Sequence, residues 1–213
     1  MSRALLLASF LVTVPSTLRA EDAPSPEPNA SRRTTVALLG GTAFGGRDRL
    51  TVSPPILPTI ATTTDPSLSP GFVLRGDESL HPSFSIGASF GLERARSQGS
   101  APTTNLLDFD LSLRLHTDAG HVGETSFQAY VVAPGGMTLE VMPDTPSYGG
   151  DRLRLGWNAG ALLGLSLVTS SGVGAMLEGG YTWRKTYDQG TAGTEATHER
   201  SGAVVRAGLV FAF

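Results

Sequence analysis

Apolar side chains occupy every second position in several runs of this chain, and the last run, residues 201–213, is the most regular. It reads SGAVVRAGLVFAF, and its odd positions from 203 onward are all apolar: Ala203, Val205, Ala207, Leu209, Phe211 and Phe213. Because side chains of a strand alternate between the two faces of a sheet, one face of this strand is continuously apolar. An unpaired apolar strand invites aggregation, so the pattern favours a closed barrel in which no strand edge is free.

The same alternation predicts seven strands in all. In residues 105–116, five apolar positions alternate with five polar ones without an error. In residues 125–141 the apolar register continues through Pro134-Gly135-Gly136 with its parity intact. That interruption indicates either a bend in one long strand or a local breach at a rim. The seven ranges are 34–45, 83–93, 105–116, 125–141, 152–168, 173–186 and 200–213.

Residues 46–80 are the one long segment without a clear strand pattern. They contain five prolines, at positions 54, 55, 58, 66 and 70. Proline cannot donate to a β-ladder, so the segment cannot be one uninterrupted central strand. We expect a long loop that contains one weak strand at about 70–77, around Phe72 and Leu74.

The last strand resembles the terminal strand of Gram-negative outer-membrane β-barrel proteins. In that family the final residue is typically phenylalanine, preceded by apolar residues at every second position, and Ala207, Leu209, Phe211 and Phe213 match this pattern. The resemblance implies that these four residues form the signal that the outer-membrane assembly machinery recognises. Bacterial single-chain barrels have an even number of strands, so the eighth strand is expected within 46–80. The predicted fold is all-β: an eight-stranded antiparallel up-and-down transmembrane barrel over residues 34–213, similar to OmpA-like and OmpX-like proteins.

The chain begins with a pattern typical of a secretory signal peptide. Arg3 provides the positive start, residues 4–14 form an apolar run, Pro15 ends it, and Ala20 is a suitable cleavage residue. The apolar run is shorter than the ~20 residues that a transmembrane helix needs. We therefore expect a cleaved signal peptide at 1–20, export, and localisation in the bacterial outer membrane. Residues 21–33 are polar and proline-rich, which predicts an extended spacer.

Composition excludes several function classes. The chain has no cysteine, which rules out disulfides, thiolate metal sites and a cysteine nucleophile. Its net charge of −3 gives no indication of a nucleic-acid partner. No histidine spacing typical of a metal site is present, so we expect neither a metal nor a cofactor. The expected partners are outer-membrane lipids and lipopolysaccharide, the outer-membrane assembly machinery and periplasmic chaperones. The protein itself is expected to be a monomer.

Loop length and aromatic residues predict the orientation of the barrel. Periplasmic turns are short and external loops are long, so the turn at 169–172 is expected on the periplasmic side. Segments 94–104, 142–151 and 187–199 and part of 46–70 are then external. Tyrosine and tryptophan concentrate at membrane interfaces, and Trp157, Tyr181, Trp183 and Tyr187 lie near predicted strand ends.

The faces opposite the apolar ones carry ionisable side chains in equal numbers of each sign. An eight-stranded barrel is only wide enough inside to be filled by side chains, and opposite charges buried there must pair. We therefore predict a structural charge network in the lumen. The alternative is functional: a narrow ion pathway, as in a pore or transport protein, or a gated salt-bridge switch. The ten residues are Glu93, Asp108, Asp110, Glu140, Glu178, Arg114, Arg152, Arg154, Arg184 and Arg206.

A lipid-modifying enzyme is the alternative from another functional class. One deacylase family of small outer-membrane barrels uses a His-x-Ser pair and a glutamate on the lipid-facing surface, and this chain contains His81-Pro82-Ser83. The short match has proline inside it, lies in an early strand, and has no suitably placed glutamate. The sequence therefore favours a non-enzymatic barrel with a structural or surface-interaction role.

Overall fold

The computed structural model describes residues 34–95, 103–117, 120–142, 153–189 and 195–213. Within these ranges it contains ten strands, and it has no helix long and apolar enough to span a membrane. The expected signal peptide and spacer at 1–33 lie outside the described residues. The strands are β1 (Thr34–Ser53), β2 (Ile60–Thr64), β3 (Ser69–His81), β4 (Phe84–Ala95), β5 (Thr104–His116), β6 (Gly120–Val122), β7 (Thr125–Val141), β8 (Leu153–Thr169), β9 (Val173–Gln189) and β10 (Glu195–Ala212).

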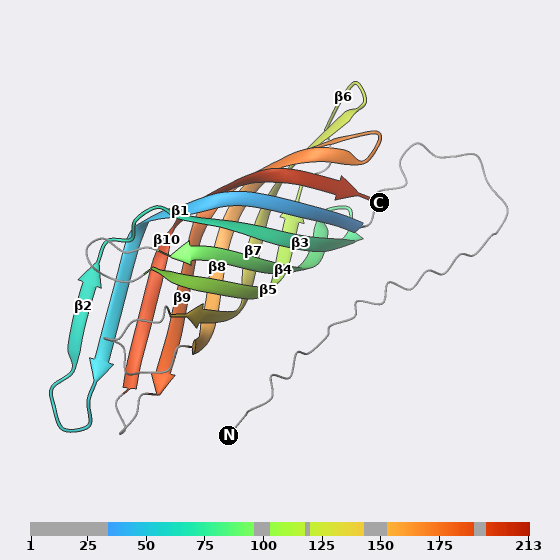
Figure 1. Cartoon of the computed structure of the whole chain (residues 1–213). Helices are drawn as coiled ribbons and strands as arrows, with labels where there is room; N and C mark the ends of the chain where they lie inside the picture. Colours follow the sequence, from blue (N-terminus) through green and yellow to red (C-terminus); the bar gives the residue numbers. More distant parts are fainter. Residues whose placement is uncertain (1–33, 96–102, 118–119, 143–152, 190–194) are drawn as a thin grey trace, which may run out of the picture. The chain divides into compact units, whose positions relative to one another are not determined.

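Eight of these strands form a closed antiparallel barrel, as predicted (Figure 1). The order is β1-β3-β4-β5-β7-β8-β9-β10, and β10 pairs back onto β1, for example at Leu38 and Leu209. The last residue continues this closure, because the Phe213 backbone N–H donates to the Thr34 carbonyl at 2.9 Å. The apolar terminal strand therefore has no open edge.

The eighth strand is β3, and it lies where the sequence predicted it. It runs from Ser69 to His81 and pairs with both β1 and β4. Pro70 is its second residue, at the end of the strand, where a missing N–H donor interrupts the ladder least. The rest of 46–80 was wrongly expected to be mostly loop. Residues 46–53 continue β1, and β2 pairs with them as a short hairpin.

The two faces of the wall separate as the alternation predicted. Leu111 and Leu163 face outward and are 74% and 67% exposed, whereas Arg114 and Glu178 are buried inside. The small apolar side chains that fill the inner face include Ala37, Leu39, Val73, Leu162 and Val210. Outward leucine, valine and phenylalanine side chains form the apolar band that a bilayer-spanning barrel requires.

The Pro134-Gly135-Gly136 interruption is part of one continuous strand, β7. Pairing with β8 lapses at Ala133 and Pro134 and resumes at Gly135 with the register unchanged. The lapse follows from proline, which has no N–H to donate to the neighbouring strand. Pairing with β5 on the other side continues through all three residues.

Three barrel strands, β1, β10 and β9, continue beyond one end of the barrel, and β2 pairs with β1 there (Figure 1). Together they form a smaller sheet, the external extension, with the order β2-β1-β10-β9. In it, residues 47–53 of β1 pair with residues 195–201 of β10. Strands β1 and β10 are therefore longer than predicted, because the polar residues of these segments pair with each other above the apolar band. The turn around Gly172, the chain end at Phe213 and the start of β1 lie at the opposite end, which the short turns assign to the periplasm.

A β-bulge joins the barrel part of β1 to its extension. Phe44 pairs with Ala203, but the next paired residue, Arg47, is opposite Ser201, so β1 has one residue more than β10 there. Gly45 and Gly46 have φ angles of 63° and 82°, which glycine adopts readily. Because an extra residue exchanges the two faces of a strand, Arg47 and Arg49 face outward and Asp48 faces the lumen.

Candidate functional site: the charged lumen

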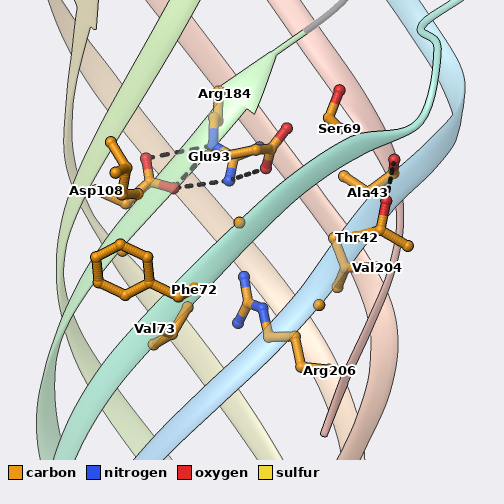
Figure 2. Close-up of a pocket in the computed structure, with 14 residues that line it drawn as sticks. Thr42, Ala43, Ser69, Phe72, Val73, Glu93, Asp108, Arg184, Val204 and Arg206 are labelled. Atoms are coloured by element: carbon orange, nitrogen blue, oxygen red, sulfur yellow. Dashed lines mark hydrogen bonds and ion pairs between the residues drawn. The ribbon is translucent and has the colours of Figure 1, made fainter.

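Charged side chains from the inner faces of the strands meet in the lumen, and the middle cluster is centred on Arg184 of β9. The Arg184 Nη2 atom lies 2.7 Å from Asp108 Oδ2 and 2.9 Å from Glu93 Oε2 (Figure 2). Asp108 also accepts hydrogen bonds from Thr138 at 2.6 Å and Asn158 at 3.3 Å. One guanidinium thus connects β4, β5 and β9 across the barrel.

A second cluster, centred on Arg75 of β3, fills the periplasmic half. Its Nη1 atom lies 2.6 Å from Glu178 Oε1, and its Nε atom donates to Asp77 Oδ2 at 3.1 Å. Tyr130 donates its hydroxyl proton to Glu178 at 2.9 Å. The guanidinium carbon of Arg114 lies 3.8 Å from the centre of the Tyr130 ring, a cation–π contact.

A third cluster lies where the barrel meets the external extension. Arg200 Nη1 lies 3.0 Å from Asp48 Oδ2, and Arg154 Nε lies 3.3 Å from Asp188 Oδ2. The imidazole of His198 lies between two carboxylates, with one ring nitrogen against Asp48 and the other 2.8 Å from Glu140. The cluster therefore connects the inner faces of β1, β7 and β10 above the apolar band.

His198 belongs to the part of β10 outside the membrane. The neighbouring residue, Glu199, faces outward and pairs with Lys185 at 2.7 Å, which marks the polar end of the outer surface. We take residues 201–212 as the membrane-spanning part of β10, close to the ~9–11 residues that a tilted strand needs. Burial alone would lower the pKa of His198, but hydrogen bonds and charge from Asp48 and Glu140 outweigh it and raise the pKa to about 9.

The ten lumen residues expected from the sequence do not all lie in these clusters. Arg206 faces the cavity beside Arg184 but forms no ion pair among the described residues (Figure 2). Asp110 accepts one weak hydrogen bond, from Ser89 at 3.5 Å, and Arg152 lies outside the described residues. Arg114 pairs with Asp77 at 3.4 Å. The seven residues that form ion pairs are therefore Glu93, Asp108, Arg114, Glu140, Arg154, Glu178 and Arg184.

Sequence reasoning missed six members of the network: Asp48, Arg75, Asp77, Asp188, His198 and Arg200. Arg75 and Asp77 lie in the weak strand, where alternation with Phe72 and Leu74 was the available signal. The bulge conceals Asp48, because simple alternation from Phe44 places it on the outer face. Including these residues, the described lumen holds eight acids, six arginines and His198. Arg152 lies outside the described residues, so the expected balance of charges stays a prediction.

The space beside Arg184 and Arg206 is small. The cavity beside Arg184 and Arg206 has a volume of ≈ 20 Å³, about the minimum that holds one water molecule. Several buried polar atoms have no hydrogen-bond partner among the described residues, including Glu93 Oε1, Asp77 Oδ1 and Glu178 Oε2. Isolated water molecules fit this arrangement, whereas a bound organic molecule would not.

A serine and a histidine lie side by side at the periplasmic end, an arrangement that resembles a nucleophile and its base. Ser85 Oγ lies 2.9 Å from His116 Nε2, and Gln128 Nε2 lies 2.8 Å from His116 Nδ1. The same Gln128 amide also donates to the Thr117 carbonyl, which fixes its orientation. His116 Nδ1 must therefore accept, and the ring carries its proton on Nε2, facing Ser85. A base that activates serine needs a lone pair there instead.

The His81-Pro82-Ser83 motif does not form a catalytic pair in this geometry. It occupies the short turn between β3 and β4 at the periplasmic end, and His81 Nδ1 accepts from the Ser83 backbone N–H at 3.3 Å. The outer leaflet lies at the opposite end of the barrel. Among the described residues, no group of three or more histidine, aspartate or glutamate side chains could hold a metal ion.

Comparisons with known proteins assign the fold. No protein-family model matches the chain, and no curated protein matches it. The outer-membrane protein OprG from Pseudomonas aeruginosa superposes with a TM-score of 0.61 at 11% identity, over 84% of this chain and 95% of OprG. AlkL, solved in lipid bilayers, gives 0.48 at 12% identity over 92% and 97%, and Neisserial surface protein A gives 0.44 at 11% over 84% and 97%. The likeness to OprG shows that the fold is that of small outer-membrane barrels.

Proposed function

We propose that this chain, an eight-stranded outer-membrane β-barrel, acts at the bacterial cell surface as an interaction protein with a closed lumen. The observation that carries the proposal is the external extension. Its tip between β1 and β2 exposes Ile56, Leu57 and Ile60, with Ile56 92% exposed. Each of these side chains would contribute about 1.5–3 kcal/mol if a partner buried it fully. An apolar tip held away from the membrane by a paired sheet suits contact with another macromolecule.

The lumen supports a structural role over a transport role. Arg184 of β9 connects acids of β4 and β5, and Arg75 of β3 pairs with Asp77 of its own strand and with Glu178 of β9. The space beside Arg184 is about the size of one water molecule. Removing one partner of a buried ion pair typically costs 3–5 kcal/mol, so spontaneous opening of such clusters is rare. A pore would need several of these pairs to separate at once.

A non-enzymatic role fits the two serine–histidine arrangements. The His116 proton faces Ser85, and the His81-Pro82-Ser83 turn lies at the end away from the outer leaflet. Neither serine has a free imidazole lone pair directed at its hydroxyl oxygen. We therefore infer that the barrel does not modify lipids.

Export and assembly complete the proposal. A cleaved signal peptide at 1–20 would deliver the chain to the periplasm, where chaperones hold it unfolded. The assembly machinery would then recognise the terminal signal, which consists of Ala207, Leu209, Phe211 and Phe213. It would insert the chain as a monomer into a membrane of phospholipid and lipopolysaccharide. Barrel closure by β1 and β10 leaves no barrel edge that would require a second copy.

The test measures adhesion of bacteria that express the protein. Wild-type cells are expected to aggregate or to adhere to protein-coated surfaces more than vector controls, and the double variant Ile56→Asp, Leu57→Asp should return adhesion to the control level. Leu68→Asp is the matched control, since Leu68 is also exposed but lies next to β3 at the barrel rim. Wild-type adhesion no higher than the vector control, at equal surface levels of protein, would overturn the proposal.

A further inference from the structure

Three cations and several aromatic rings gather on the outer surface where the barrel meets the external extension. This basic–aromatic patch consists of Arg47 and Arg49 of β1, Lys185 of β9, Trp157 of β8 and Trp183 of β9, with Tyr181, Tyr187 and Glu199 beside them. The lumen network uses none of these residues. Arg47 and Arg49 are exposed, and the chain as a whole has a net charge of −3, so this local excess of positive charge is unusual for it.

Strand register brings the patch together from four strands. Arg49 lies opposite Glu199, Glu199 opposite Lys185, and Lys185 opposite Trp157, in one row across the sheet. In the next row, Arg47 lies opposite Ser201 and Ser201 opposite Trp183. The bulge at Gly45 and Gly46 is what directs both arginines outward. A groove of ≈ 560 Å³ is lined by Arg47 of β1, by Lys185 and by the rings of Trp157, Tyr181 and Trp183, and Arg49 lies two residues beyond Arg47 on the same face of β1.

The aromatic side of the groove is internally braced. The Tyr181 and Trp183 rings lie 4.8 Å apart at 55°, and the Tyr181 hydroxyl donates to Ser201 at 3.1 Å. The Trp157 indole N–H donates to the Tyr187 hydroxyl oxygen at 3.3 Å. These contacts hold the Tyr181, Tyr187 and Trp157 rings in place beside the groove. Among the described residues, Arg47 and Arg49 form no ion pair, so their donors are available to a ligand.

The patch lies at the depth where lipid headgroups meet the protein. Going from the chain end toward the extension, the outward residues of β10 are apolar through Val205 and Ala203, and the first charge is Glu199. Tryptophan and tyrosine mark the same level, as they do at membrane interfaces. The occupant that this depth provides is therefore an amphiphile, with acyl chains below and a polar headgroup at the level of the cations.

We propose that the basic–aromatic patch binds the phosphorylated headgroup of an outer-leaflet lipid. Arg47 and Arg49 direct their guanidinium groups at the phosphate, which arginine binds in a bidentate geometry, and Lys185 adds a third charge. Trp157 and Trp183 pack against the glycerol or sugar and the upper acyl segment. Glu199 weakens binding, since it neutralises Lys185 at 2.7 Å. The site rests on the outer-membrane location and external orientation of the proposed function.

The chain itself provides the readout, because Trp157 and Trp183 are its only two tryptophans. The protein is refolded into phosphatidylcholine vesicles that contain either brominated phosphatidylglycerol or brominated phosphatidylcholine at the same mole fraction. Bromine quenches tryptophan fluorescence on contact, so the ratio of quenching by the two lipids measures headgroup preference. A third arm adds inorganic phosphate to the solution.

We expect the wild type to prefer the brominated anionic lipid. Each of Arg47→Gln, Arg49→Gln and Lys185→Gln should reduce this preference about fivefold, the equivalent of one basic residue at an anionic surface. Glu199→Gln should increase it. Arg94→Gln is the matched control, since Arg94 is also an exposed arginine at the external end, on β4, and should have no effect. Circular dichroism confirms that each variant is a folded barrel.

Equal quenching by the two lipids in the wild type would overturn the proposal, as would a loss in Arg94→Gln equal to that in Arg47→Gln. Displacement of the anionic lipid by millimolar inorganic phosphate would also overturn the proposal, since the site would then bind phosphate without the lipid. This experiment uses no cells and leaves Ile56 and Leu57 unchanged. Its failure is therefore distinguishable from failure of the adhesion proposal.

Discussion

At the scale of single residues, two neighbours in the chain can lie in different environments, one facing lipid and the other facing the lumen. Leu111 of β5 is 74% exposed on the outer wall, and Ser112 is buried in the lumen. An arginine placed at position 111 or at position 112 would therefore differ only in the face of the sheet on which it lies. The lumen beside Ser112 also contains a carboxylate. Asp77 Oδ1 and Ser112 Oγ both lie beside Gly87, and Asp77 Oδ1 has no hydrogen-bond partner among the described residues.

Leu111→Arg should therefore destabilise the barrel more than Ser112→Arg. An arginine on the lipid face near the midplane costs about 2–4 kcal/mol, whereas an arginine at 112 avoids that cost and faces Asp77. Denaturant titration of both variants refolded in lipid vesicles would rank them. If Ser112→Arg is as costly as Leu111→Arg, crowding in the lumen outweighs the lipid penalty or the assigned register of β5 is wrong.

At the scale of elements, the bulge in β1 controls the external extension. A Cβ atom added at Gly46 would collide with the Ser201 carbonyl oxygen, whereas one added at Gly45 meets nothing within 4 Å. Both residues have positive φ, so alanine is strained by about 1 kcal/mol at either position. Only Gly46→Ala also forces β1 and β10 apart.

We expect Gly46→Ala to loosen the extension and Gly45→Ala to leave it paired. Limited proteolysis of refolded protein would reveal cleavage between residues 46 and 64 in the first variant, with the barrel itself intact. Equal cleavage of the two variants would mean that the close approach of Gly46 to Ser201 does not hold the extension.

His198 makes the extension sensitive to alkaline pH. Its folded pKa of about 9 is above the ordinary value of 6.5, so its stabilisation is complete below about pH 6.5 and is lost as pH rises through 9. Amide hydrogen exchange in β10 residues 195–200 should therefore accelerate between pH 7 and 10 beyond its intrinsic pH dependence. His198→Gln should remove that excess, and an unchanged excess would assign the effect to another group.

At the scale of the whole molecule, closure and assembly depend on the last strand in different ways. The Phe213 backbone N–H contributes one hydrogen bond, to Thr34, while its ring is 73% exposed. Deleting Phe213 therefore removes little from the folded barrel but removes the terminal aromatic residue of the expected assembly signal.

Deletion of Phe213, or Phe213→Asp, should lower the amount of protein in the outer membrane while purified protein still refolds in vesicles. Membrane fractionation and a refolding assay measure the two quantities separately. Unchanged outer-membrane levels would contradict the assembly role of this residue. A parallel failure to refold would mean that the residue acts through stability.

Alternation of apolar and polar residues by itself determined the fold class, seven of the eight barrel strands and the face of nearly every residue in them. It sufficed because a barrel wall has lipid on one side and a packed polar interior on the other. Odd and even positions of a strand face opposite sides, so one set is apolar and the other is small or polar. The even strand number of such barrels then located β3 within 46–80.

Only the tertiary structure decided which charges meet and where the strands end. Asp48 and His198 lie 150 positions apart, and closure of β10 onto β1 brings them together. The bulge at Gly45 and Gly46 reverses the faces of the next residues, so parity counted from Phe44 assigns Arg47 to the wrong side. Local pattern cannot reveal such a reversal, because its cause is the fit of two glycines against the backbone of a strand at the other end of the chain.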